Sequence, residues 1–156
     1  AGRQALYERN RYSPAVRSDG FLFVSGQVGS RADGSPEPDL AAQVRLAFSN
    51  LNAVLQAAAQ AIVGAVRQVD TVARLAGDEF TVLCENVDTD DAAQHVLDKL
   101  RQAFAQPLQV DGQPMVVRAS MGISLYPKDG DDARTLLASA DVAMYQAKLR
   151  HREISR

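Results

Sequence analysis

The sequence contains a single cysteine, Cys84, among its 156 residues, so a disulfide within the chain is excluded. A chain of this kind fits the reducing cytoplasm, and we expect a cytoplasmic protein. Only two histidines occur, His95 and His151, and neither stands at a spacing typical of a metal site or a catalytic triad. The first ten residues have no apolar core, which predicts no signal peptide.

A strong excess of charge is lacking too. The chain has 17 basic and 19 acidic residues and a formal net charge of -2, which argues against a charge-driven binder of nucleic acid polymers. We expect no apolar run as long as a membrane span, and hence no membrane partner. The hydrophobic share of 46% supports a packed core, and the length fits one domain over residues 1–156.

A long helix is predicted after Asp39, which follows Pro38 and is a suitable N-cap. Apolar residues recur there at steps of three and four, so one face of one continuous helix is expected to be buried. That face consists of Leu40, Val44, Phe48, Leu51, Leu55, Ala58, Ile62, Val66 and Val69. Gly64 inside this helix costs about 1 kcal/mol relative to alanine.

Shorter elements surround the long helix. A short edge strand within residues 12–20 and a buried strand at 20–29 are predicted before it. After it, the patterns predict strands at 71–75, 80–85, 108–110 and 114–126, and helices at 88–104 and 131–149. From residue 20 the order is β-α-β-β-α-β-α, with a small extra hairpin. It predicts an α+β fold, a ferredoxin-like sandwich whose antiparallel sheet has helices packed on one face.

Three motifs in the second part of the chain resemble one family. They are RLAGDEF at 74–80, VRASMGISLYPKDGDD at 117–132 and ADVAMYQAK at 140–148. Their order and spacing resemble GGDEF domains, the diguanylate cyclases, over residues 61–152. The first strand of that family is not part of the resemblance.

The first part of the chain resembles a different family. YSPAVRSDGFLFVSGQVG at 12–29 and DLAAQVRLAFSNLNAVLQAAA at 39–59 are similar to the Rid (YjgF) imine deaminases, which are typically trimers. We interpret the chain as a chimera of a Rid-like segment, 1–59, and a GGDEF-like segment, 60–156, joined inside a helix near 57–62. A join inside a helix favours engineered recombination over natural fusion. Both origins stay open, and so does self-association.

The GGDEF resemblance implies a site for GTP and a divalent metal ion. It makes Asp78 a metal ligand and Glu79 the acidic catalytic residue beside it, and it assigns nucleotide contacts to Gly77, Lys148 and Arg152. A further metal-binding Asp and the base-reading residues of that family come from and follow its first strand. The segment in its place, FLFVSGQVG, contains no acid.

We therefore interpret the cyclase residues as remnants of an incomplete site. Ala76 also replaces the first glycine of the signature and adds a methyl group at a turn that approaches phosphate. A solvated turn for the acids and a solvated helix end for the cations are the alternatives. We expect no cofactor, with Mg²⁺ needed only if GGDEF-type activity remains.

Two further pairs of residues match ligand sites of the two families. Arg67 and Asp70 form R-x-x-D ahead of the signature, which resembles the inhibitory site that binds cyclic di-GMP; a helix-end ion pair is the alternative. Tyr12 and Ser25 match positions lining the Rid active site. The substrate-binding arginine of that family lies beyond the part that this sequence resembles, so local packing is the favoured role of both.

Three functions therefore stay open. The favoured one is a catalytically silent chimeric domain. The second is a GGDEF-type domain that binds cyclic di-GMP or GTP weakly, with weak or no diguanylate cyclase activity. The third is a Rid-type imine hydrolase.

Overall fold

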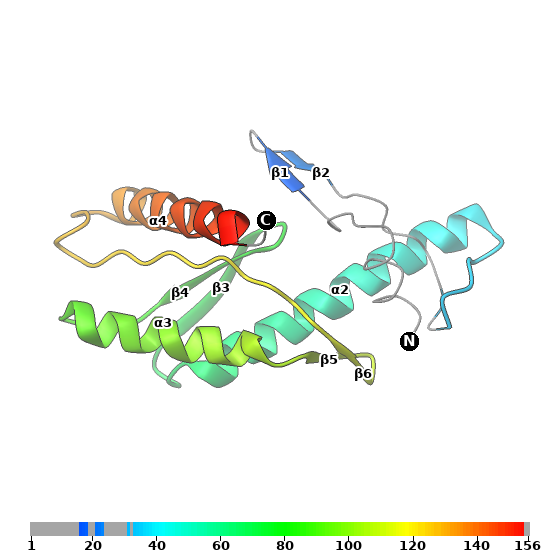
Figure 1. The fold of residues 1–156 in the computed structure, drawn as a ribbon, viewed down its shortest axis with the longest axis horizontal. Helices are drawn as coiled ribbons and strands as arrows, with labels where there is room; N and C mark the ends of the chain where they lie inside the picture. The colour runs from blue at the N-terminus through cyan, green and yellow to red at the C-terminus, as the bar shows by residue number, and fades with distance from the viewer. Residues whose placement is uncertain (1–15, 19–20, 24–30, 32, 155–156) are drawn as a thin grey trace.

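The computed structural model describes residues 16–18, 21–23, 31 and 33–154 (Figure 1). In this part of the chain the helices are α2 (Leu40–Ala65), α3 (Asp90–Ala105) and α4 (Ala133–Ile154). The strands are β1 (Val16–Ser18), β2 (Phe21–Phe23), β3 (Thr71–Ala76), β4 (Glu79–Leu83), β5 (Leu108–Val110) and β6 (Gln113–Met115). They pair as antiparallel hairpins, which confirms the predicted α+β class.

Helix α2 is continuous over 26 residues, as predicted, and the predicted join lies inside it. The Asp39 carboxylate accepts a hydrogen bond from the backbone N–H of Ala42 at 2.7 Å, which confirms the N-cap. Leu55, Ala58 and Ile62 are buried, so the same helix face stays in the core across residues 57–62. This half of α2 contacts α3 and β5, whose buried residues are Ala93, Leu97 and Val110.

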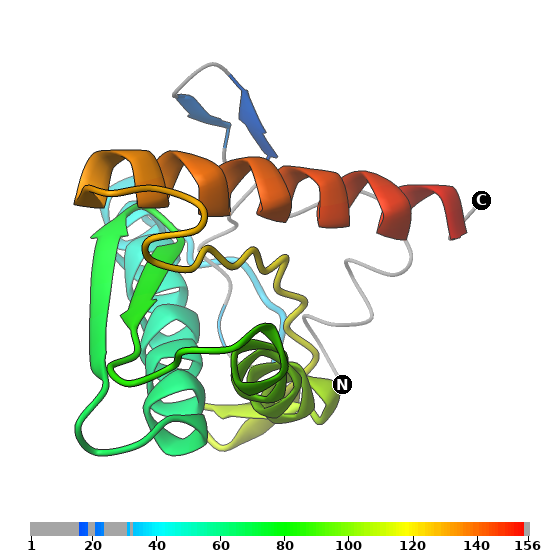
Figure 2. The same ribbon diagram turned by 90° about the vertical axis from the view of Figure 1, so that its left-hand side faces the viewer.

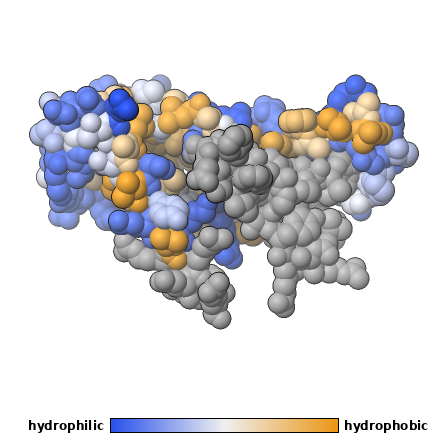
Figure 3. All heavy atoms as spheres, turned by 90° about the horizontal axis from the view of Figure 1, so that it is seen from above, coloured by the Kyte–Doolittle hydropathy of each residue, from blue (hydrophilic) through white to orange (hydrophobic). Residues whose placement is uncertain are grey.

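The N-terminal half of α2 corrects the prediction of one buried face. Leu40, Val44 and Phe48 are 75%, 49% and 69% exposed, although they continue the face of Leu55 and Ile62. Figure 3 shows this apolar surface at the end of the molecule where α2 begins. Among the described residues, α2 makes its main contacts with α3 and β5, and its buried side chains lie between Asn50 and Ile62.

Helix α2 is also the one helix of the described residues that is long and apolar enough to cross a membrane, with a mean hydropathy of 1.3. This differs from the expectation that no apolar run reaches that length. Length and composition are weak evidence for a membrane span, because core helices of globular proteins have the same properties. In the structure, 17% of the apolar window of α2 is buried.

The predicted single sheet is divided, in the described residues, into the separate sheets β1–β2, β3–β4 and β5–β6. Asp111 and Gly112 have φ angles of 50° and 73° and form the predicted β5–β6 turn. The predicted strand at 114–126 ends at Met115, and residues 116–125 form no ladder with other described residues. A strand needs a hydrogen-bonding neighbour, and β2, from the segment predicted as the first strand, is paired with β1.

The segment after β6 runs between α3 and α4 (Figures 1 and 2). Gly122 lies so close to α4 that a Cβ there would overlap the carbonyl oxygen of Ala140 and the backbone nitrogen of Met144. The Ser124 hydroxyl donates a hydrogen bond to the Leu136 carbonyl at 2.9 Å. Helix α4 is therefore docked through close backbone approach. Leu137 of α4 is exposed.

Candidate functional site

The AGDEF sequence forms the predicted tight turn between β3 and β4. Ala76 pairs with Glu79, and Gly77 between them has a φ of 50°, a left-handed conformation that glycine adopts at little cost. The Arg74 guanidinium donates a hydrogen bond from Nε to the Gly77 carbonyl at 2.8 Å. A register shift between Arg74 and Ala76 accompanies this contact. The side chain of Arg74, a residue of β3, therefore stabilises the turn that follows this strand.

The two acids of the turn differ in exposure. Asp78 at the tip is exposed, and Glu79 at the start of β4 is half-buried. Among the residues that the structure describes, no three His, Cys, Asp or Glu side chains come together in a way that could hold a metal ion. Mg²⁺ prefers six oxygen ligands in octahedral geometry. Asp78 and Glu79 are therefore not joined by a third such side chain from the described residues.

The nucleotide-contact residues of α4 that the GGDEF resemblance implies are not gathered at this turn. Lys148 is an exposed residue of α4, and Arg152 lies on the same helix. The C-terminal end of α4 overlaps the β3–β4 turn in Figure 1, but Figure 2 shows the two well apart. Tyr12 and Ser25 lie outside the described residues.

Arg67 and Asp70, in contrast, form a well-defined pair in the loop between α2 and β3. The Arg67 guanidinium donates from Nη2 to Asp70 Oδ1 at 2.7 Å and from Nε to Oδ2 at 3.2 Å. The backbone N–H of Arg67 also donates to Asp70 Oδ2, at 2.8 Å. Arg67 Nη2 also donates to the Glu85 carbonyl at 2.5 Å, which connects this loop to the residues that follow β4.

The electrostatics of this pair are those of a charge-assisted hydrogen bond. The Asp70 side chain is only 1% exposed, whereas that of Arg67 is 47% exposed. The side-chain hydrogen bonds from Arg67 lower the pKa of Asp70, and the same bonds raise the pKa of Arg67. Burial raises the pKa of the neighbouring Cys84 thiol. The helix-end ion pair anticipated as the alternative reading of R-x-x-D is thus present.

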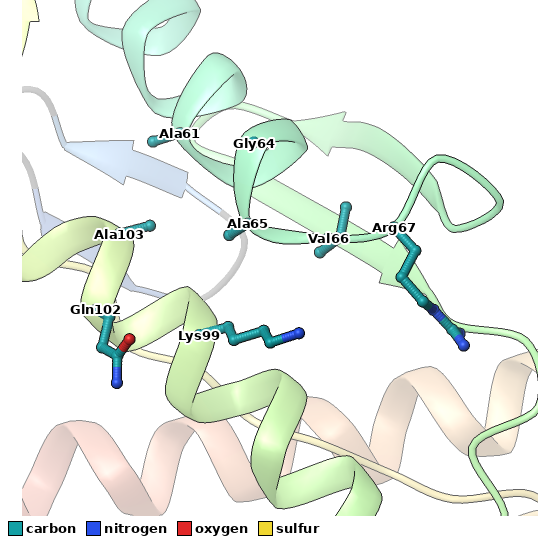
Figure 4. Close-up of a pocket in the computed structure, with 8 residues that line it drawn as sticks. All are labelled: Ala61, Gly64, Ala65, Val66, Arg67, Lys99, Gln102 and Ala103. Carbon is teal, nitrogen blue, oxygen red and sulfur yellow. The ribbon is translucent and has the colours of Figure 1, made fainter.

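An open hollow of about 440 Å³, whose lining includes Arg67, lies where the end of α2 faces α3 (Figure 4). Its walls from α2 and the loop are Ala61, Gly64, Ala65, Val66 and Arg67, and its walls from α3 are Lys99, Gln102 and Ala103. The sequence did not predict this hollow, because its two walls lie far apart along the chain. Two of its lining residues stand out in the sequence: Gly64, which weakens a helix, and Arg67 of the R-x-x-D motif.

Two family profiles match overlapping parts of the chain. Residues 49–154 match the family described as "Diguanylate cyclase, GGDEF domain". Residues 2–69 match the family described as "Endoribonuclease L-PSP". The two matches overlap over residues 49–69, most of which form α2. The predicted join at 57–62 falls inside this overlap.

Similar proteins divide in the same way. The first part is 67% identical over 58 residues to the RutC family protein YjgH of Escherichia coli, covering 37% of this chain and 44% of YjgH. The second part is 41% identical over 96 residues to the cyclic di-GMP phosphodiesterase NbdA of Pseudomonas aeruginosa, covering 61% of this chain and 12% of NbdA. The chain therefore spans less than half the length of either relative.

A solved structure agrees with the second match. The GGDEF domain of PA1120 (YfiN or TpbB) from Pseudomonas aeruginosa is 36% identical, with a TM-score of 0.62 over 69% of this chain and 67% of that chain. The exposed half of α2 starts in the stretch that only the L-PSP profile matches. More than half of YjgH lies outside its match with this chain.

Proposed function

This chain belongs to the diguanylate cyclase GGDEF domain family, and from that premise we propose that it is a catalytically silent member that binds cyclic di-GMP weakly at Arg67 and Asp70. Silence is proposed because the family match begins at residue 49, inside α2, so it does not include the strand that precedes this helix in GGDEF domains. The segment before it matches the L-PSP family instead. That start of the match is the observation on which the proposal rests.

The donor set at the turn supports this proposal. Asp78 and Glu79 would be the residues that hold a divalent metal, and they are too few for an octahedral cation whose charge must be shared with a triphosphate. The acid that the GGDEF resemblance places on the first strand has no counterpart in FLFVSGQVG. The described residues therefore do not fit a productive metal site, and we assign no catalytic step to this turn.

We also propose that the chain is a recombinant of two fragments, of engineered origin. The overlap of the two family matches within one helix supports this. If both source proteins have a helix at this place, the sequence can change from one to the other inside it while the backbone hydrogen bonds of the helix continue. The continuous α2 has the geometry that such a design requires.

The proposed ligand site is supported by the shape and charge around Arg67. An arginine fork suits a phosphate or a guanine edge, and an aspartate accepts hydrogen bonds from guanine nitrogens. Both side chains are already engaged with each other, and Arg67 also bonds the Glu85 carbonyl. A ligand must compete with these bonds, so weak binding is expected. NbdA, a phosphodiesterase of cyclic di-GMP, is a relative over this region.

We expect cyclic di-GMP to bind the wild-type chain weakly and Arg67→Ala to bind it at least about tenfold more weakly. Isothermal titration calorimetry measures both affinities. Arg101→Ala is the matched control, because Arg101 is an exposed arginine paired with Asp98 on α3 at 2.9 Å. Since Arg67→Ala leaves Asp70 buried without its partner, Arg67→Lys is a second variant that keeps the charge and removes the fork. Affinity unchanged in both Arg67 variants would reject the assignment.

A further inference from the structure

The hairpin of β3 and β4 has an open edge on the side of β4. In the described residues β4 pairs only with β3, and in an antiparallel pair half of the backbone N–H and C=O groups point away from the partner strand. Figure 2 shows β4 on the side of the hairpin that is turned toward residues 116–125, with β3 on the outer side. Burial agrees with this view, because four of the five β4 residues are half-buried and five of the six β3 residues are exposed. The open edge of β4 therefore faces inward.

Residues 116–125 have the geometry of a strand that lacks its ladder. Gly122 and Ser124, two positions apart, both lie against α4, the first through its backbone and the second through its hydrogen bond to the Leu136 carbonyl. A period of two is that of an extended strand. From residue 116 to residue 124, no backbone N–H or C=O group forms a hydrogen bond with another described residue. This segment is therefore a second edge whose backbone groups can accept a neighbouring strand.

One added strand, paired with β4 on one side and with residues 116–125 on the other, would join these edges into a single sheet. Its direction follows from the course of the chain. Helix α2 runs opposite to β3 in Figure 2, so a strand that leads into α2 would run parallel to β3 and antiparallel to β4. A strand in the interior of a sheet, with other elements packed on it, is rich in apolar residues and poor in charge. The occupant is therefore an uncharged strand that precedes α2.

We propose that the open edge of β4 binds the chain's own segment 21–29, FLFVSGQVG, as an inserted strand. This segment has no charged residue and begins with four apolar residues. The ten residues that connect it to α2, 30–39, span up to about 33 Å when extended. Asn50, the first buried residue of α2, lies only about 15 Å along the helix from Leu40. The connection is therefore long enough for the segment to reach the part of α2 that lies in the core.

The insertion competes with the pairing of β2 and β1. That pairing covers three residues, and an isolated two-stranded hairpin is marginally stable in water. The inserted strand gains hydrogen bonds on both of its sides instead of one. It supplies no carboxylate to the β3–β4 turn, because segment 21–29 contains no acid. The sheet is thus completed without a further metal ligand, and the proposal does not depend on binding of cyclic di-GMP.

The test is amide hydrogen exchange of the full chain, followed by NMR. In the wild type, about every second amide of residues 117–124 should exchange at least about a hundredfold more slowly than in an unfolded peptide, because the inserted strand accepts its hydrogen bond. Phe23→Asp places a charge in the segment and should abolish this protection. Val16→Asp is the matched control, because Val16 of β1 is the register partner of Phe23 and its replacement disturbs the same β1–β2 pair. Val16→Asp should keep the protection of residues 117–124.

Each outcome decides the proposal. Unprotected amides at residues 117–124 of the wild type would overturn it, because the edge would then be empty. Equal effects of Phe23→Asp and Val16→Asp would overturn it as well, since the β1–β2 hairpin alone would explain them. If Phe23→Asp unfolds the whole chain while Val16→Asp does not, the segment belongs to the core, and the proposal is supported. Protection that disappears on dilution would assign the strand to a second copy of the chain and contradict insertion of the chain's own segment.

Discussion

One alanine inserted after Ala59 is expected to lower the free energy of unfolding by about 3 kcal/mol or more. Each added residue rotates the downstream part of a helix by about 100°. Leu55 and Ala58 precede the insertion and would keep their places, whereas Ile62 would leave the core next to α3 and β5. The hairpin that follows α2 would turn with it. The continuity of α2 across the two family matches is therefore a requirement of the fold.

Thermal unfolding followed by circular dichroism measures this effect. For a chain of this length, a loss of about 3 kcal/mol corresponds to a Tm lower by roughly 6–12 °C. Val63→Ala is the control within the same helix, because Val63 is 58% exposed and its truncation should cost no more than about 0.5 kcal/mol. An insertion variant that melts like the wild type would show that the helix is interrupted near Ala59.

Gly122→Ala is expected to cost about 3 kcal/mol, because one methyl group cannot be placed between residues 116–125 and α4. The new Cβ would overlap the Ala140 carbonyl oxygen and the Met144 backbone nitrogen, and it would lie 2.9 Å from the Met144 Cα. These are backbone atoms of a helix, so relief requires α4 to move as a whole. Denaturant unfolding should give a lower midpoint with an unchanged slope.

The control for this variant is another glycine-to-alanine change. At Gly64 a Cβ meets nothing within 4 Å, so Gly64→Ala should leave stability unchanged or raise it by up to about 1 kcal/mol. The two substitutions are chemically identical, and only the surroundings differ. Equal midpoints for both variants would mean that α4 does not pack against Gly122 as described.

Local signals in the sequence were sufficient for most of the helices and turns. The step of three and four residues along α2 predicted its length, and Asp39 predicted its start. The Asp111–Gly112 pair predicted a turn because Asp and Gly tolerate positive φ angles, and both residues have them in the structure. The glycine of AGDEF, Gly77, likewise has a positive φ angle in the turn between β3 and β4. These features depend on residues that are neighbours in the chain.

Features that depend on distant partners could not be predicted. The apolar pattern of α2 is the same at Phe48 and Ile62, but only Ile62 has elements packed on it in the described residues. Residues 116–125 alternate like a strand, yet a ladder requires a neighbour, and β2 pairs with β1. The hollow combines Gly64 with Lys99, which come from different helices. In a chain that combines segments of two families, an apolar pattern can be present without the element that would pack against it.

The most direct test of the proposed silence is a diguanylate cyclase assay. The purified chain is incubated with GTP and either Mg²⁺ or Mn²⁺, and the product is followed by chromatography. We expect no cyclic di-GMP, because the loss of an ionic metal ligand removes several kcal/mol of charge stabilisation and each 1.4 kcal/mol is about tenfold in rate. Formation of cyclic di-GMP by the wild type that disappears in Glu79→Ala would contradict the account and establish a working cyclase site at the β3–β4 turn.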